Sequence, residues 1–107
     1  MEIADVVEQL ADILGLTTVA AIGGVGETRA VQQWMGGREP QRPNVLRFAL
    51  QLALMIATAE DRGVARAWFQ GSNPQLGDRS PVMLLRNEPL EDVQGQLMAA
   101  ARSFAAR

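Results

Sequence analysis

The chain has 107 residues, of which 48% are hydrophobic, and a formal net charge of −2. It contains no cysteine and no histidine, which excludes disulfides and thiolate metal sites and removes the commonest metal ligand and general base. We therefore expect one hydrophobic core, no metal site and no cofactor.

The hydrophobic pattern indicates an all-α fold, because apolar residues recur at helical spacing and strand-like alternation is hard to find. The longest uninterrupted apolar run, residues 52–57, is far shorter than the roughly 18 residues of a membrane span, and no basic segment precedes an apolar stretch at the amino terminus. We expect a compact, cytoplasmic, non-membrane protein of about six to seven helices. The predicted helices cover residues 3–14, 16–22, 27–35, 44–58, 64–70, 81–85 and 89–104.

Glycine and proline separate these helices. The segments Gly23–Gly26 and Gly36–Gly37 end the second and third helices, and a proline opens the fourth. The fourth helix is apolar nearly all round, so other helices must cover it and we expect it at the centre. A soft boundary near residues 61–63 divides the chain into a first half, residues 1–60, and a second half, residues 61–107.

Charge is distributed unevenly along the chain. Residues 1–28 carry five acids and no base, whereas residues 29–66 carry six arginines against three acids. Every base is arginine, whose planar guanidinium suits forked contacts with carboxylate or phosphate, although a GC-rich genome explains the same preference. The middle of the chain is therefore the candidate contact for nucleic acid.

The first half has the order of elements of a helix-turn-helix. Two short helices are joined by a glycine-containing break, and a proline-bearing connection and a long apolar helix follow. Residues 28–38 resemble the recognition helix of Xre-type repressors, in which a polar start precedes a buried aliphatic residue, a tryptophan and a glycine-basic exit. Glu27 departs from that pattern, because an acid at the helix start repels phosphate. The glycine-rich break also departs from it.

In the helix-turn-helix arrangement the start of the second helix meets the base edges of DNA. We predict that Arg29, Gln32 and Gln33 contact bases, because arginine can pair in a forked manner with guanine and glutamine with adenine. The residues predicted to contact the DNA backbone are Thr28, Arg38 and Arg42. The alternative is that these side chains only solvate the helix, with Trp34 in the core in either case.

The second half carries a dense run of turn-forming residues between two helical patterns. The run comprises Trp68-Phe69, Asn73-Pro74, Leu76-Gly77, Arg79-Ser80-Pro81 and Leu84-Leu85. It resembles the toxin-binding half of the Xre/MbcA/ParS-type antitoxins of bacterial toxin–antitoxin pairs. The two halves together carry that resemblance over about residues 16–105.

The resemblance implies that the chain performs no catalysis and binds a RES-type toxin that acts on NAD, or a related ADP-ribosyltransferase. It also implies that the carboxy-terminal helix covers the nucleotide pocket of the toxin. Physically, Asn73 can form a turn with its own backbone, Pro74 fixes the exit and Gly77 permits a positive φ, so the loop is stiff and docks at a low cost in entropy. The predicted toxin-binding residues are Asn73, Asp78, Arg79, Ser80, Arg102, Phe104 and Arg107.

Other interpretations stay open at this point. Arg79 can instead pair with Asp78 or Glu88 and close the domain, and Arg102 and Arg107 can be solubilising charges. In function, the alternative is a free-standing helix-turn-helix regulator whose second half only dimerises. An enzyme fits poorly, because the adjacent carboxylates stand near helix ends, where they serve capping. We expect a homodimer or a hetero-oligomer with the toxin, and operator DNA is a second candidate partner.

Overall fold

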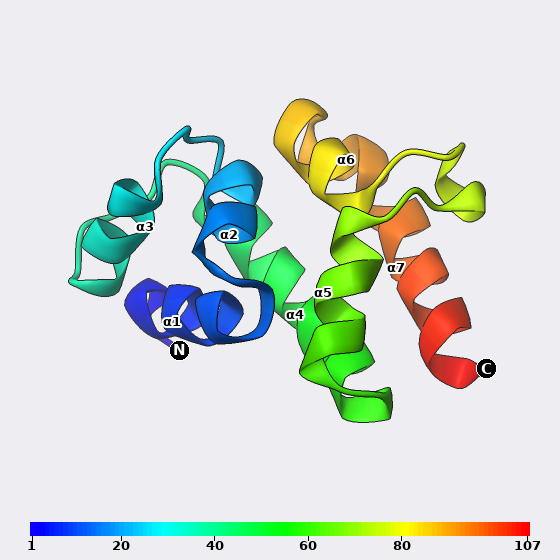
Figure 1. Ribbon diagram of the computed structural model, residues 1–107. Helices are drawn as coiled ribbons and strands as arrows, with labels where there is room; N and C mark the ends of the chain where they lie inside the picture. The colour runs from blue at the N-terminus through cyan, green and yellow to red at the C-terminus, as the bar shows by residue number, and fades with distance from the viewer.

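Helices account for the regular structure of the chain in a computed structural model that describes residues 1–107 (Figure 1). There are seven α-helices, one 3-10 turn and no β-strand, which confirms the all-α prediction. No helix combines the length and the apolar character needed to cross a membrane. The elements are α1 (Ile3–Leu14), α2 (Leu16–Ile22), α3 (Thr28–Met35), α4 (Pro43–Ala59), α5 (Arg62–Gln70), η1 (Pro74–Leu76), α6 (Pro81–Asn87) and α7 (Leu90–Ala106).

The bounds of α1 and α2 match the predicted ones, and the other helices differ from them by no more than two residues at either end. α5 begins at Arg62 because the Oδ1 atom of Asp61 accepts a hydrogen bond from the backbone N–H of Val64 at 2.8 Å. α4 begins at Pro43 itself, since proline has the φ of the first helical turn and needs no hydrogen-bond partner there. Hydrophobic spacing alone cannot show these capping effects.

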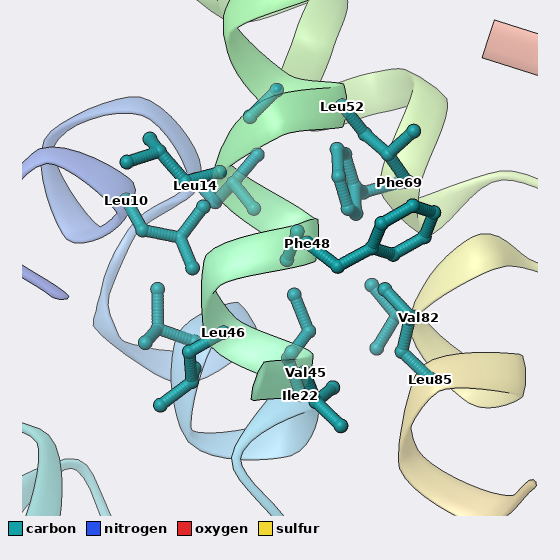
Figure 2. Packing of buried hydrophobic residues seen from close by; sticks show 14 of the residues in the cluster. Leu10, Leu14, Ile22, Val45, Leu46, Phe48, Leu52, Phe69, Val82 and Leu85 are labelled. Atoms are coloured by element: carbon teal, nitrogen blue, oxygen red, sulfur yellow. The ribbon is translucent and has the colours of Figure 1, made fainter. Parts of the chain in front are cut away.

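α4 lies at the centre of the fold, as its apolar circumference predicts. α1, α2 and α3 lie on one side of it, and α5, α6 and α7 lie on the other (Figure 1). Figure 2 shows Leu10 and Leu14 of α1 approaching α4 from one side, and Phe69 of α5 and Leu85 of α6 from the other. The residues that α4 itself buries are Val45, Leu46, Phe48, Ala49, Leu50, Leu52, Ala53 and Ile56.

One hydrophobic cluster holds both halves together. It contains 30 buried residues, and all seven α-helices contribute to it. Burial of this apolar surface is the main favourable term in folding. Because the cluster is continuous through α4, a cavity made in it is expected to weaken the first and second halves alike.

Candidate functional site

Two surfaces carry the residues that the sequence singled out, and the first is formed by α3. Its short apolar stripe buries Val31 and Trp34 against the core, so the polar residues of the same helix face outward. We define the α3 surface as the exposed side chains Thr28, Arg29, Gln32, Gln33 and Arg38.

The glycine-rich break before α3 has a packing reason. A Cβ atom at Gly23 would lie 2.5 Å from Cη2 of Trp34, so the ring of Trp34 occupies the space that a side chain would need. Gly24 has a φ of 81°, which glycine adopts far more readily than other residues. The break therefore lets α3 pack closely on the end of α2, a role that helical periodicity alone does not indicate.

The α3 surface brings together five of the six residues that the sequence predicted as DNA contacts. Arg29 and Gln32 are exposed, and neither makes a side-chain hydrogen bond within the protein. Arg38 donates from Nη1 to Oε1 of Gln33 at 2.9 Å. Because a glutamine that pairs with adenine uses its oxygen as well as its nitrogen, Gln33 would have to leave Arg38 to read a base in that way.

Arg42, the sixth predicted DNA contact, is turned inward. Its Nη2 donates to the carbonyl oxygen of Leu85 at 2.7 Å, and its Nη1 donates to the carbonyl oxygens of Arg86 at 3.1 Å and Ile22 at 3.3 Å. These carbonyls end α2 and α6, where the helix dipole favours a cation. With these donors occupied and the residue half-buried, we assign Arg42 a structural role in place of the predicted phosphate contact.

Arg86, which the sequence analysis did not single out, completes this arrangement. Its Nη1 donates to the carbonyl oxygens of Ala21 at 3.0 Å and Val25 at 3.1 Å. We call Arg42 and Arg86 the arginine clamp, because together they join α2, α6 and the start of α4. The two residues are 44 positions apart in the chain, and their only common signal in the sequence is a place at a helix end.

The second surface begins at the loop between α5 and α6, which folds as the sequence predicted. Oδ1 of Asn73 accepts a hydrogen bond from the backbone N–H of Gln75 at 2.9 Å, and Gly77 has a φ of 67°. Oγ of Ser80 accepts from the backbone N–H of Met83 at 3.2 Å and caps α6. Asp78 also has a positive φ, of 64°, which adds to the strain of the turn.

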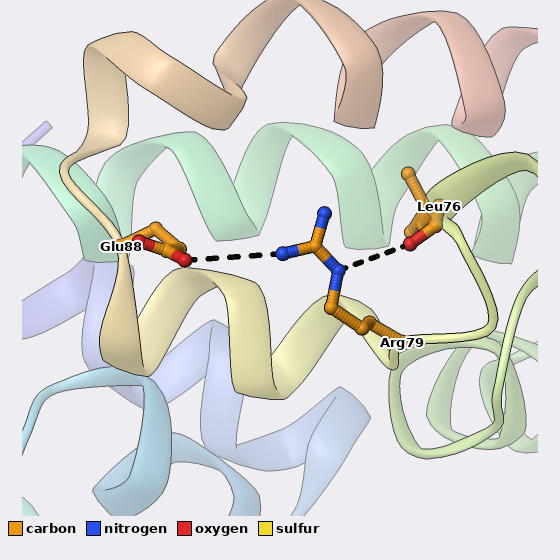
Figure 3. A network of polar contacts seen from close by, with 3 residues as sticks. All are labelled: Leu76, Arg79 and Glu88. Atoms are coloured by element: carbon orange, nitrogen blue, oxygen red, sulfur yellow. Dashed lines mark hydrogen bonds and ion pairs between the residues drawn. The ribbon is translucent and has the colours of Figure 1, made fainter.

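Arg79 leaves this loop and reaches toward α6 and η1 (Figure 3). Its Nε donates to the carbonyl oxygen of Leu76 at 3.2 Å, and its Nη1 lies 3.8 Å from Oε1 of Glu88. The two charged side chains are 52% and 43% exposed, and such pairs contribute only about 0–1 kcal/mol to stability. The predicted alternative of pairing with Glu88 is thus present, yet the guanidinium stays open to a partner.

A groove between α5 and α7 brings Phe104 and Arg107 together with Asn73. It has a volume of about 600 Å³, and we name it the α5–α7 groove. Nε2 of Gln75 donates to Oγ of Ser103 at 3.2 Å, which ties the loop to α7 across one end. The groove is lined by Val64, Ala67, Trp68, Gly71, Ser72, Asn73, Pro74, Gln75, Ala100, Ser103, Phe104 and Arg107.

One wall of the α5–α7 groove ends in an aromatic–cation pair. The guanidinium carbon of Arg107 lies 3.9 Å from the centroid of the Phe104 ring, and Nη2 of Arg107 lies 4.0 Å from Oε1 of Glu60. Trp68, on the α5 side, is buried, and its Nε1 has no hydrogen-bond partner. A buried donor without a partner is uncommon in native proteins.

The structure thus brings three of the seven predicted toxin-binding residues to one groove, namely Asn73, Phe104 and Arg107. The other four, Asp78, Arg79, Ser80 and Arg102, do not line it. Arg102 is exposed on α7 and makes no side-chain hydrogen bond or ion pair.

Comparison with known proteins adds no relative to this description, because no family model, curated protein or solved structure matches the chain. The likeness to the antitoxin family therefore stays a prediction from the residues themselves.

Proposed function

We propose that the chain is a cytoplasmic antitoxin that binds a RES-type, NAD-consuming toxin with its second half and covers the active site of that toxin. In the same proposal the first half binds operator DNA through the α3 surface and represses transcription of the pair. The chain itself catalyses nothing.

The observation that carries the proposal is the loop from Asn73 to Ser80. Internal hydrogen bonds fix its two ends, and Asp78 and Arg79, whose backbones pair with Asn73 at the neck of the loop, have exposed side chains. A surface that is ordered before binding loses little conformational entropy when a partner docks, so more of the contact energy appears as affinity.

Charge and aromatic character support a protein partner for the second half. Arg79, Arg102 and Arg107 are exposed cations on α7 and the loop before α6, and Phe104 adds an aromatic ring beside the α5–α7 groove. Arginine and aromatic residues are the types that most often dominate protein interfaces. A terminal helix that carries them can obstruct a nucleotide pocket by its bulk.

The test is co-expression with the product of the adjoining gene, followed by purification and measurement of the dissociation constant. The variant is Arg79→Glu, and the matched control is Arg62→Glu, whose wild-type arginine is also exposed and pairs with Asp12 on another part of the surface. We expect Arg79→Glu to weaken the complex by at least about tenfold, because like charges placed across an interface cost several kcal/mol.

The control variant should bind as the wild type does, and both variants should keep their helical content. A complex whose affinity is unchanged by Arg79→Glu would remove this residue from the interface. If the neighbouring gene product neither co-purifies nor binds at all, the antitoxin proposal itself is rejected.

The α3 surface favours a second candidate, a free-standing regulator that binds an operator and has no toxin partner. Arg29, Gln32 and Gln33 form a polar, exposed face on a short helix, as a DNA-reading helix requires. Operator binding by the purified chain, with no association with the neighbouring gene product, would select this candidate.

A further inference from the structure

An open hollow lies beside the start of α3, and the second half of the chain contributes to its wall. It has a volume of about 610 Å³ and lies between α2 and the first turn of α3. Thr17, Thr28 and Arg29 line it from the first half, and Arg86 of α6 lines it from the second half. A residue of the second half thus stands next to the α3 surface.

Arg86 is held in place by only one of its nitrogen atoms. Nη1 bonds the carbonyl oxygens of Ala21 and Val25, whereas Nε and Nη2 make no hydrogen bond and the side chain forms no ion pair. The guanidinium is therefore fixed at one edge and keeps donors at the other. A cation already held in one position loses little rotamer entropy on binding an anion.

The groups around the hollow suit an anion with several oxygen acceptors. Two guanidinium groups, from Arg29 and Arg86, stand against one carboxylate, from Glu27, and Thr17 and Thr28 add hydroxyl donors. Arginine is the side chain that matches phosphate geometry with parallel hydrogen bonds. The side chains of α3 that are proposed to face the bases start at the same place, so a phosphate of the DNA backbone is the anion expected at this hollow.

We propose that Arg86 is a DNA-contacting residue, and that a backbone phosphate of duplex DNA enters the hollow between α2 and α3. The free edge of Arg86 and the hydroxyls of Thr17 and Thr28 hold this phosphate, while Arg29 continues to the base edges. The assignment rests on the DNA-binding part of the proposed function. It makes the second half a direct contributor to DNA affinity.

The test compares Arg86→Gln with Arg42→Gln in the full chain. The two arginines form the same kind of bonds to helix-end carbonyls, but Arg42 does not line the hollow. The probe is a fluorescently labelled random-sequence DNA duplex, because phosphate contacts do not depend on base sequence. Affinity is measured by anisotropy over a fourfold range of salt, with thermal unfolding of each variant beside it.

We expect both variants to unfold at a lower temperature, since each loses part of the arginine clamp. Only Arg86→Gln should flatten the dependence of log affinity on log salt, by about 0.9 for one lost phosphate contact. Over a fourfold change of salt this corresponds to about a threefold to fourfold smaller loss of affinity than the wild type shows. Added inorganic phosphate should displace the duplex from the wild-type chain only weakly.

Two results would overturn the assignment while the wild type still binds DNA. An unchanged salt slope in Arg86→Gln would leave this residue with a structural role only. An equal flattening of the salt slope in both variants would mean that loss of the arginine clamp causes the effect, and not loss of a phosphate contact. If the wild type binds no duplex but still binds its toxin, the DNA contact is rejected and the antitoxin proposal stands.

Discussion

The α3 surface and the α5–α7 groove are built in different ways. They belong to helices that lie on opposite sides of α4 (Figure 1). The α3 surface consists of one face of a single helix, set by the burial of Val31 and Trp34, and of Arg38 just after that helix. The groove needs three segments, namely α5, the loop after it and α7, held in register by a hydrogen bond between Gln75 and Ser103. A surface on one element is fixed by local sequence, whereas a groove between elements depends on how the whole core packs.

The difference has a consequence for function. If the two surfaces serve different partners, a local change at one end should leave the other end working. A change in the common core should instead disable both, because one cluster of buried residues joins them. Substitutions at each surface and in the common core can separate these two cases.

The largest effect is expected at Phe69, which is fully buried and belongs to the core between α4, α5 and α6. Phe69→Ala should lower the free energy of unfolding by about 3–5 kcal/mol, the usual cost of removing a buried phenylalanine ring. Chemical denaturation measures the change. Both DNA binding and toxin binding should fall with the folded fraction.

The control for this change is Phe104→Ala, on the surface of α7. Its ring is only partly buried and lies under the guanidinium of Arg107, so its loss should cost far less stability. The control should impair toxin binding alone. Loss of only one of the two binding activities in Phe69→Ala would contradict a core that both halves share.

A smaller and more local effect is expected at Gly23. Gly23→Ala forces a methyl group against the ring of Trp34 and should cost about 1–3 kcal/mol, the typical cost of overpacking. Because the displaced ring belongs to α3, DNA affinity should fall more than toxin affinity does. The comparison is made by measuring both affinities at a temperature where the variant is fully folded.

Gly26→Ala is the matched control in the same break, since a Cβ atom there has no neighbour within 4 Å. It should change stability by no more than about 0.5 kcal/mol, as surface substitutions usually do. Equal effects of the two substitutions would show that the backbone freedom of the break matters and the close approach of Trp34 does not.

The smallest effect is expected at the cap of α6. Ser80→Ala removes the oxygen that accepts from Met83 and should cost about 1 kcal/mol of stability. The same loss frees one end of the loop that displays Arg79, so the complex with the toxin should dissociate faster. Surface plasmon resonance measures the rate.

Ser80→Thr keeps a capping hydroxyl and should restore both the stability and the slow dissociation. Operator binding should stay unchanged in both Ser80 variants, because the cap lies at the first turn of α6, whereas Arg86 lies in its last turn. Weaker DNA binding in Ser80→Ala would mean that loss of the α6 cap alters the position of α3 through the arginine clamp.

Much of the fold could be predicted from the sequence, because it depends on interactions between residues that are close together in the chain. The apolar spacing gave seven helices, the apolar circumference of α4 gave its central place, and Asn73, Gly77 and Ser80 gave the turns and the cap. Each of these features depends on residues within a few positions of one another. Exposure of Arg29, Gln32 and Gln33 follows in the same way from burial of the opposite face of α3.

The features that the sequence did not predict all join distant segments. Arg42 was predicted to contact DNA, but its bonds to Leu85 and Arg86 arise only when α6 packs beside α2. The role of Arg86 and the α5–α7 groove were missed for the same reason. Long arginine side chains reach many partners, so their position in the chain does not decide which carbonyl they meet.

We propose that this chain binds and silences an NAD-consuming toxin. The most direct measurement is the rate of NAD consumption by the purified product of the adjoining gene, during titration with this chain. We expect consumption to stop at a fixed molar ratio, with Arg62→Glu acting as the wild type does and Arg79→Glu requiring a large excess. If consumption continues undiminished at every ratio of the wild-type chain, this chain is not an antitoxin of that toxin.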